Sequence, residues 1–456
     1  MTNSKLLKSI ALFVLSIGTT FAAPVLQTTL DNGLKIIIKQ TNKPNVAVAM
    51  VWYKVGSADE PGGITGISHA LEHMMFKGTA SYAPNEYSKL IAQNGGQENA
   101  FTSKDYTAYF AKINSSKLPI FLTLEADRMA NLNLDAAEFA KEIQVVREER
   151  RMRTDDNPQA LLYERFMALS HLTSPYHHPV VGWMDDLKNM KVTDLKQWYK
   201  QWYSPNNATV VIVSDKLPKT VLALVSEKFS GIPCRPLPVR KPQREPVGLG
   251  EKEVSVKPSV KANIPMLMMG YSTPSLMTAA DNQKWQPYAL EVMAGILSGG
   301  NSSRLAKELV RGKQSAIEAS ASYDMYDRYD NQFSLFGVVK QLNDVPLLKK
   351  DLLAQVQRLQ SYLVSPAELN RIKNQVLASN IYAKDSVFGL AMELGMLTCI
   401  GLSPQTGLDY IEKIKAVTPK QIQDVARLYL TPNNLTNAVL IPNKPHVINT
   451  STRRES

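Results

Sequence analysis

Short apolar runs alternate with longer amphipathic segments along most of the chain, and this alternation predicts strands and helices in turn. Residues 30–34 place an Asn-Gly turn before the apolar run 35–39, a combination that predicts a β-hairpin. A Val-rich run over 46–55 predicts a further strand, and residues 98–103 and 106–110 predict a strand pair. The first half of the chain is therefore expected to contain a sheet.

Helices are predicted where apolar residues recur every three or four positions. The first begins at Ile67, after a Gly-containing loop from Gly56 to Gly66. The Asp-Asp-Asn-Pro sequence at 155–158 ends the longest helix. The other helices predicted in this half cover 84–94, 118–131, 136–153, 159–170 and 193–203.

The two halves of the chain end in the same way. Ser204-Pro205-Asn206-Asn207 follows a helical segment and precedes a β-branched strand, and Thr431-Pro432-Asn433-Asn434 does the same. Because helix, turn and strand all recur, a duplicated domain is the simplest interpretation. The predicted fold class is α+β, with two similar αβ domains, each a mixed sheet with flanking helices.

Five prolines between Pro233 and Pro246, in a stretch without periodicity, predict an interdomain linker. The predicted parts are a signal peptide (1–22), an N-terminal metal-bearing domain (23–232), a linker (233–250), a C-terminal domain (251–442) and a tail (443–456).

Composition and charge exclude few classes of protein. The chain has 456 residues, of which 44% are hydrophobic and 20% charged, as is typical of globular proteins. The formal net charge is +11, but the basic residues are scattered, so nucleic acid is not a predicted partner. Whether Cys234 and Cys399 form a disulfide stays open.

The N-terminus predicts export. Lys5 and Lys8 precede an apolar run over 10–17, and small residues up to Ala22 offer a cleavage site. A cleavable signal and a periplasmic location are therefore expected, with an uncleaved N-terminal anchor as the alternative. No later stretch is apolar enough to be a stable membrane span.

Candidate chemistry lies in the sequence His69-Ala70-Leu71-Glu72-His73, an H-x-x-E-H motif. On a helix, two histidines four residues apart share one face, so both can reach one Zn²⁺. Glu72 lies beside them as a candidate general base for a zinc-bound water. The chain has only 6 histidines, which makes two ordinary histidines at this spacing the weaker interpretation.

A catalytic zinc needs a third protein ligand. Glu142, Glu148 and Glu149 lie in one predicted helix, where Glu142 and Glu149 are two turns apart and point the same way. From spacing alone they compete with a solvated charged face, and His177 and His178 are rival ligands.

These residues resemble the pitrilysin/insulinase family of zinc metallopeptidases. The resemblance covers nearly the whole mature chain and is strongest to short bacterial members, which are similar to the subunits of mitochondrial processing peptidase. It is carried by the motif at 69–73, by Phe76-Lys77-Gly78-Thr79, by Asn99-Ala100-Phe101-Thr102, and by Val145-Val146-Arg147-Glu148-Glu149-Arg150.

The resemblance implies one Zn²⁺ per chain, bound by His69, His73 and Glu149, because the family's spacing selects Glu149 over Glu148. It implies Glu72 as general base and Glu142 as a support behind the ligands. It also implies a clamshell of two similar domains.

The resemblance further implies peptide substrates. Asn99, Ala100, Phe101 and Thr102 are expected on an edge strand that binds substrate as an added strand, the alternative being an ordinary internal strand. In the second half, Arg311 matches an Arg that helps to hold substrate in active relatives.

The chain departs from the family pattern after Arg311. Active relatives often carry a Tyr seven residues on, where this chain has Glu318, and Tyr323 and Tyr326 come later. The chain is therefore expected to act either alone or in a homodimer or heterodimer whose second subunit supplies substrate-clamping residues.

Three functions follow. A zinc-dependent endopeptidase acting on peptides or unfolded segments is favoured. A precursor-processing peptidase subunit has the same chemistry with narrower substrates. A non-catalytic structural subunit is disfavoured because the whole metal set is present.

Overall fold

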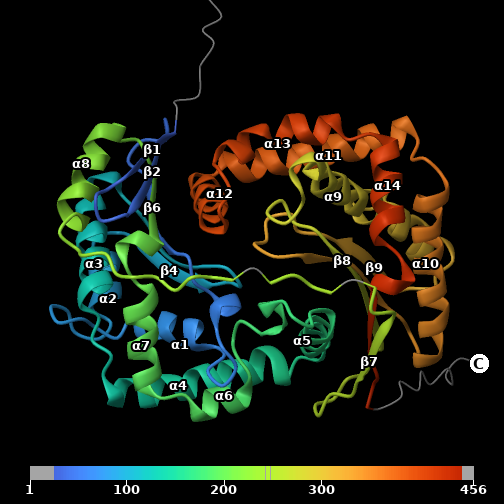
Figure 1. Cartoon of the computed structure of the whole chain (residues 1–456), viewed down its shortest axis with the longest axis horizontal. Helices are drawn as coiled ribbons and strands as arrows, with labels where there is room; N and C mark the ends of the chain where they lie inside the picture. The colour runs from blue at the N-terminus through green and yellow to red at the C-terminus, as the bar shows by residue number, and fades with distance from the viewer. Residues whose placement is uncertain (1–24, 242, 247, 444–456) are drawn as a thin grey trace, which may run out of the picture.

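A computed structural model describes residues 25–241, 243–246 and 248–443. Each half of the described chain is built around its own mixed sheet, and the halves face each other as a clamshell (Figure 1). This confirms the predicted fold class. The expected signal peptide at 1–22 and nearly all of the expected tail lie outside the described residues.

The first sheet has six strands in the order β1-β2-β6-β3-β5-β4. The predicted hairpin is confirmed, because β1 and β2 pair antiparallel around a turn in which Gly33 has a φ of +84°. Only β2 and β6 pair parallel, and β4 is an edge strand. The strands are β1 (Leu26–Thr29), β2 (Lys35–Gln40), β3 (Ala47–Tyr53), β4 (Gln97–Thr102), β5 (Thr107–Ile113) and β6 (Ala208–Ser214).

Except for α5, helices of the first half pack on one face of this sheet, and their apolar residues form a single core with it. The predicted long helix over 136–153 ends its α-helical part at Arg150. Residues Arg151–Asp155 widen into a π-helical turn, in which Asp156 N–H donates to Arg151 O. The helices are α1 (Ile67–Met74), α2 (Glu86–Gln93), α3 (Leu118–Asn131), α4 (Ala136–Arg150), α5 (Pro158–Ser170), α6 (Met184–Asn189), α7 (Val192–Trp202) and α8 (Pro218–Phe229).

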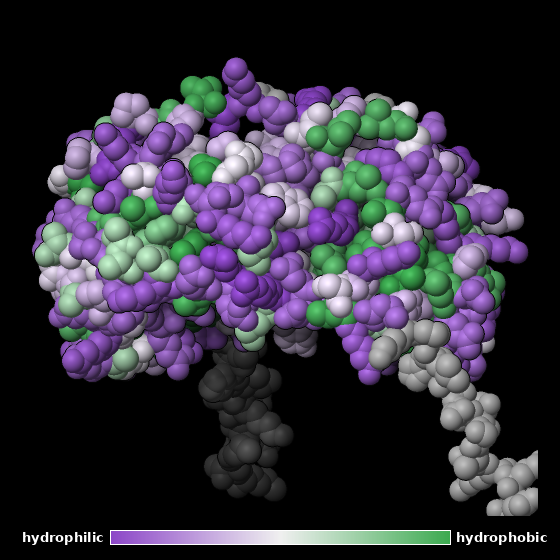
Figure 2. Space-filling model, turned by 90° about the horizontal axis from the view of Figure 1, so that it is seen from below, coloured by the Kyte–Doolittle hydropathy of each residue, from purple (hydrophilic) through white to green (hydrophobic). Residues whose placement is uncertain are grey.

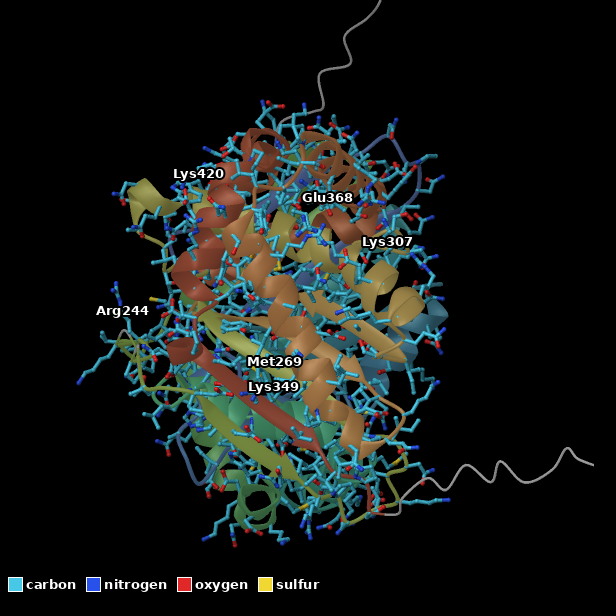
Figure 3. The ribbon with its side chains drawn as sticks, turned by 90° about the vertical axis from the view of Figure 1, so that its right-hand side faces the viewer. Arg244, Met269, Lys307, Lys349, Glu368 and Lys420 are labelled. Atoms are coloured by element: carbon cyan, nitrogen blue, oxygen red, sulfur yellow. The ribbon has the colours of Figure 1, made fainter. Side chains whose placement is uncertain are left out.

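The second half repeats this plan with five strands in the order β7-β11-β8-β10-β9. In Figure 3, which views the molecule from the side of this half, α10 with Lys349 lies over the sheet that contains Met269. The strands are β7 (Lys252–Val256), β8 (Met266–Thr273), β9 (Glu318–Ser322), β10 (Asn331–Val338) and β11 (Leu435–Leu440). The helices are α9 (Trp285–Ser298), α10 (Val345–Ser361), α11 (Pro366–Asp385), α12 (Val387–Ile400), α13 (Gln405–Ala416) and α14 (Pro419–Tyr429).

The repeated Pro-Asn-Asn sequences occupy equivalent places in the two halves. Pro205–Asn207 and Pro432–Asn434 each form a 3-10 turn, which leads into β6 and β11 respectively. Each of these strands pairs parallel with one neighbour and antiparallel with the other. The duplication predicted from the two turns is thereby confirmed.

Each half contributes one helix that packs against the sheet of the other half. Helix α12 of the second half packs against β3 and β6 of the first sheet, and α5 of the first half packs against β7, β8 and β11 of the second. Both contacts are apolar, and both place a glycine against an aromatic ring: Gly395 against Trp52, and Gly270 against Phe166. The two halves therefore cannot separate without exposing apolar surface.

The described residues between Phe229 and Lys252 contain no helix or strand. Cys234 is exposed, Cys399 is buried, and both are free thiols. No single helix in the described ranges is long and apolar enough to cross a membrane. Helices α12 and α13 together have the length and composition of a membrane span, but the pair is bent by 97°. On the face seen in Figure 2, hydrophilic residues separate the hydrophobic areas.

Candidate metal centre

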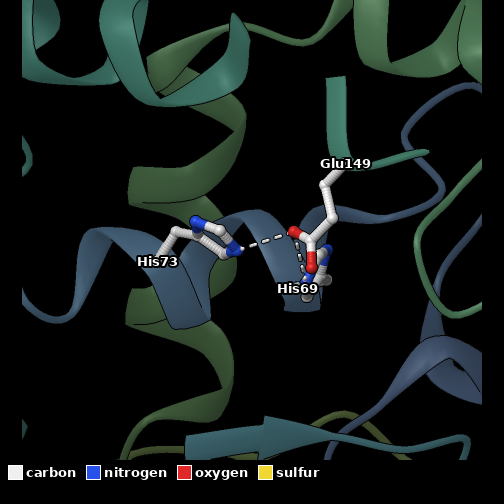
Figure 4. Close-up of side chains that lie close together, drawn as sticks. All are labelled: His69, His73 and Glu149. Carbon is white, nitrogen blue, oxygen red and sulfur yellow. Dashed lines mark ion pairs between the residues drawn. The ribbon is translucent and has the colours of Figure 1, made fainter. Parts of the chain in front are cut away.

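Side chains from α1 and α4 converge on one point. Nε2 of His73 lies 3.3 Å, and Nε2 of His69 3.6 Å, from Oε2 of Glu149 (Figure 4). One ligand atom of each residue lies within 4.8 Å of the other two. Within the described ranges, no other group of three or more His, Cys, Asp or Glu side chains meets this condition.

This arrangement fits a zinc ion. Ligand atoms about 2.0–2.1 Å from a tetrahedral zinc lie about 3.4 Å from one another, close to both observed separations. Burial lowers the pKa of His69 to about 3, so its imidazole is neutral. A neutral imidazole forms no ion pair with Glu149, but it has a lone pair for a metal. Two His and one Glu leave a tetrahedral position for water, as catalytic zinc sites require.

The N-terminal end of α1 is held by a buried carboxyl group. Glu60 accepts hydrogen bonds from the backbone N–H of Gly66 (2.6 Å) and of Ser68 (2.8 Å). Burial nevertheless raises the pKa of Glu60 to about 7. Gly66 has a φ of +86°, which favours glycine. These contacts fix the start of the helix, and its geometry then brings His69 and His73 to one face.

Helix α4 presents its glutamates in different directions. Oε1 of Glu142 lies 3.2 Å from Nδ1 of His73, and its Oε2 lies 2.7 Å from Nζ of Lys77. Glu149, two turns later, faces both imidazoles. Glu148 is exposed and pairs with Arg151. Spacing alone left open whether these glutamates face the histidines or solvent. In the structure, Glu149 and Glu142 reach the histidines, and Glu148 does not.

The rival histidines do not join this group. His177 Nδ1 lies 2.7 Å from the carbonyl oxygen of Ser174, and desolvation lowers the pKa of His178 to about 4. Both residues line the same cavity as the metal group. They are therefore wall residues of the cavity.

Glu72 lines the same cavity as His69 and His73. Thr102 Oγ1 donates a 2.5 Å hydrogen bond to Glu72 Oε2. Burial raises the pKa of Glu72, and the bond from Thr102 opposes that rise. The contact joins α1 directly to the last residue of β4, so this carboxyl group is held at the meeting point of the two elements.

The cavity beside the metal group has a volume of about 850 Å³. Asn99, Ala100, Phe101 and Thr102 of β4 form one side of it. Because β4 pairs only with β5, its other edge is free for a further strand. The predicted edge strand is confirmed, whereas its role in binding a peptide is not tested by geometry alone.

The second-half residues considered for substrate binding lie elsewhere. Arg311, in a π-helical segment over Ala306–Gly312, donates to the carbonyl oxygen of Asn301. Tyr323 Oη donates to Pro274 O, and Tyr326 packs against the second core. Among the described residues, none of these three lines the cavity beside the metal group.

Several contacts around this centre escaped the sequence reasoning. Arg153 lies 2.5 Å from Oε1 of Glu149, and its place four residues later on the chain was a signal for that pair. Arg150, 3% exposed, binds Glu164 and the carbonyl oxygen of Gly182. Glu60 carried no sequence signal, because its partners are backbone N–H groups at the start of α1.

Comparison with known families gives two matches along the chain. Residues 35–180 match "Insulinase (Peptidase family M16)", and residues 189–376 match "Peptidase M16 inactive domain". The first stretch contains the converging histidines and glutamate, and the second contains no histidine.

Individual proteins agree with these matches. The zinc protease PqqE of Helicobacter pylori is 33% identical over 371 residues, which are 79% of this chain and 81% of that protein. The mitochondrial-processing peptidase subunit beta of Lentinula edodes is 22% identical over 88% of this chain and 87% of its own. The crystal structure of a protease from Helicobacter pylori superposes with a TM-score of 0.86 and 30% identity, covering 92% of this chain and all of that one.

Proposed function

Because the chain belongs to the insulinase family of zinc proteases, peptidase family M16, we propose that it is a zinc-dependent endopeptidase of peptides and unfolded polypeptide segments. One observation carries the proposal. The candidate ligand atoms of His69, His73 and Glu149 converge beside a cavity that these residues line together with Glu72. A donor set alone would fit a structural metal, whereas a carboxyl group beside it fits hydrolysis.

Zinc at this site would polarise the scissile carbonyl and lower the pKa of the attacking water. Glu72 then acts as general base, taking a proton from that water and later giving it to the leaving amine nitrogen. Thr102 holds the carboxyl group of Glu72 in place for both transfers. Glu142 orients His73 through Nδ1, and Lys77 holds Glu142 in turn.

The substrate is proposed to add to β4 as an extra strand. Main-chain hydrogen bonds to Asn99–Thr102 place few demands on sequence, which suits extended peptides. A folded protein presents few free strands of this kind. The cavity lining also includes Tyr163 and Met167 of α5, which would contact substrate side chains.

The test compares the wild type with Glu72→Gln in zinc content and in cleavage of an unstructured peptide. Bound zinc in both proteins, with cleavage lost only in the variant, supports the proposal. Absence of zinc from both proteins, or full cleavage by the variant, contradicts it. Glu148→Gln is the matched control, because Glu148 is exposed and contacts Arg151 rather than the centre.

A second candidate, a processing-peptidase subunit that needs a partner, rests on the second half. Arg311, Tyr323 and Tyr326 are absent from the described lining of the cavity, so substrate-clamping groups are proposed to come from a homodimer or a heterodimer partner. Activity per mole that falls on dilution of the purified chain supports this candidate. Activity independent of concentration, in a chain that sediments as a monomer, contradicts it.

We also propose that the protein is exported, on the basic and then apolar sequence of residues 1–22. Cell fractionation with sequencing of the mature N-terminus tests this. A chain that retains residues 1–22 in the cytosolic fraction contradicts it.

A further inference from the structure

A buried group of charges joins the two halves outside the metal centre. It consists of side chains from the first half, the linker and the segment between β9 and β10, and we refer to it as the interdomain charge cluster: Asp59, Lys104, Asp105, Arg240, Asp327 and Arg328. Tyr176 is hydrogen-bonded to it through Asp105. Three acids face three bases, so the cluster can be neutral as a whole.

Arg328 is the centre of the cluster. Its Nη2 lies 3.1 Å from Oδ2 of Asp59, and its Nε lies 3.0 Å from Oδ1 of Asp105. Its backbone N–H also faces Oδ2 of Asp105 at 3.0 Å. One guanidinium group therefore holds two carboxylates that are far apart in the sequence. The planar fork of arginine offers five donors in fixed directions, from three nitrogen atoms.

The contact is enclosed. The side chains of Asp59 and Asp105 are each 3% exposed, and that of Arg328 is 13% exposed. Buried charges of this kind require good geometry, because loss of one partner leaves the other without water. The cluster therefore tolerates little displacement of any of its members.

The carboxylate of Asp59 is connected to α1, the helix that carries His69 and His73. Asp59 is followed directly by Glu60, whose carboxyl group holds the backbone N–H groups of Gly66 and Ser68 at the start of α1. His69 follows at the next position. Arg328 is thus connected to α1 through Asp59 and the adjacent Glu60, so a shift of Arg328 would change the position of the start of α1.

The carboxylate of Asp105 is connected to β4, the strand proposed to bind substrate. Lys104 and Asp105 follow β4 after one intervening residue, Ser103, and Nζ of Lys104 lies 3.2 Å from Oδ2 of Asp327. The loop before α1 is tied to the same turn, since Ala58 N–H donates to Lys104 O at 2.9 Å. Beyond the turn, Thr102 contacts Glu72.

We infer that Arg328 is a positioning residue of the second half, which aligns β4 with α1 so that a peptide on the strand meets the catalytic centre. The inference rests on the proposed function. It assigns a task to a half that has no metal group of its own among its described residues. The second half would thereby influence catalysis through the alignment of β4 and α1, without contacting Glu72 or the proposed metal ligands.

Arg328 is suited to a test because it is not the only contact that holds the halves together. The apolar contacts of α12 with the first sheet and of α5 with the second remain when it is replaced. A variant should therefore fold, with its halves joined but its strand and helix less well aligned.

The experiment measures kcat, KM and bound zinc for Arg328→Gln with an unstructured peptide. We expect kcat to fall by about tenfold or more, because small misplacements of reacting groups cost such factors. Zinc content should be unchanged, since the cluster contacts no proposed ligand. Arg328→Lys should recover little activity, because an ammonium group lacks the planar fork whose separate Nε and Nη2 atoms reach Asp105 and Asp59.

Arg304→Gln is the matched control. Arg304 forms a two-bond pair with Glu368 at 2.9 and 2.7 Å, is 8% exposed, and lies in the second half away from the cluster; Glu368 is labelled in Figure 3. It should lower stability without lowering kcat at a temperature where both variants are folded. An equal loss of kcat in both variants overturns the inference.

Asp105→Asn tests the same contact from the other side and replaces Arg328→Gln if that variant does not fold. The double variant should lose less kcat than the two single losses multiplied together, because both substitutions remove the contact between Arg328 and Asp105. Wild-type kcat in Arg328→Gln and in Asp105→Asn overturns the inference while leaving the proposed function intact. A zinc-free, inactive wild type contradicts the proposed function itself.

Discussion

Oε1 of Glu142 lies 3.2 Å from Nδ1 of His73, on the ring nitrogen that does not face Glu149. A carboxylate in this place fixes the orientation and tautomer of a metal-binding imidazole. We therefore expect Glu142→Gln to lower zinc affinity by about tenfold to a hundredfold, as such supporting contacts do. Competition with a chelator of known affinity measures the change.

The control for Glu142 is its neighbour on the same helix. Glu148→Gln removes one carboxylate that is 57% exposed and pairs with Arg151. It should leave zinc affinity within about twofold of the wild type, since exposed pairs contribute little. Equal effects of the two substitutions would mean that charge alone, and not contact with His73, governs affinity.

Arg150 supports the wall of the cavity through a buried ion pair. Its Nη1 lies 2.6 Å from Oε2 of Glu164, and the side chains are 3% and 4% exposed. Arg150→Gln leaves Glu164 as a buried charge without its ionic partner, which costs about 3–5 kcal/mol of unfolding free energy. Denaturant unfolding followed by fluorescence measures this loss.

Arg151 is the comparison for Arg150. Its side chain is 49% exposed, so Arg151→Gln should change the unfolding free energy by no more than about 0.5 kcal/mol. If Arg150→Gln were no more costly than Arg151→Gln, the buried pair would not stabilise this wall.

Gly395 lets α12 approach the first sheet. A Cβ atom at this position would lie 2.1 Å from Cε2 of Trp52, a ring that is fully buried. Alanine normally stabilises a helix interior by about 1 kcal/mol relative to glycine. At this site we expect the opposite sign, so Gly395→Ala should lower the Tm in a thermal scan.

Gly231→Ala is the control for Gly395→Ala. A Cβ atom at Gly231 would meet nothing within 4 Å, so its Tm should not fall. An unchanged or higher Tm for Gly395→Ala would show that the two halves adjust their packing freely at this contact.

Glu291 makes stability depend on pH. Burial raises the pKa of Glu291 to about 7, although Tyr410 donates a 2.5 Å hydrogen bond to it. An unfolded chain releases this proton near pH 4.5, so between about 4.5 and 7 the folded protein binds more protons at this group. Stability contributed by the group therefore falls as pH rises through that window, by about 3 kcal/mol at most.

Glu291→Gln should remove this dependence. The variant should have a higher Tm than the wild type at pH 8, where the wild-type carboxyl group is ionised, and a similar Tm near pH 4.5. Glu412→Gln, at a carboxylate that is 76% exposed, should show no such difference. The prediction is wrong if the Tm difference between Glu291→Gln and the wild type is the same at both pH values.

Local sequence patterns were sufficient to predict most of the helices and strands. The hairpin at Gly33, the helix that begins at Ile67 and the break before Pro158 depend on neighbouring residues, so the structure confirms them where they were expected. The end of the long helix was wrong by a few residues. Its last turn is widened around Arg150, whose partner Glu164 lies on the next helix.

The sequence by itself determined the candidate metal-binding motif, because His69 and His73 are four residues apart and helix geometry alone brings both imidazoles to one face. It also determined the duplication, through two similar turns. Helical spacing placed Glu142 and Glu149 on one face, and the family resemblance selected Glu149 over Glu148, but whether that face meets the histidines depends on how α4 packs against α1.

Only the tertiary structure decided how the halves act on each other. The contacts of Gly395 with Trp52 and of Arg328 with Asp59 and Asp105 join residues hundreds of positions apart. Side chains of this kind leave no periodic pattern in a sequence. A glycine at a close approach and an arginine between two buried carboxylates acquire their roles only when the chain has folded and excluded water around them.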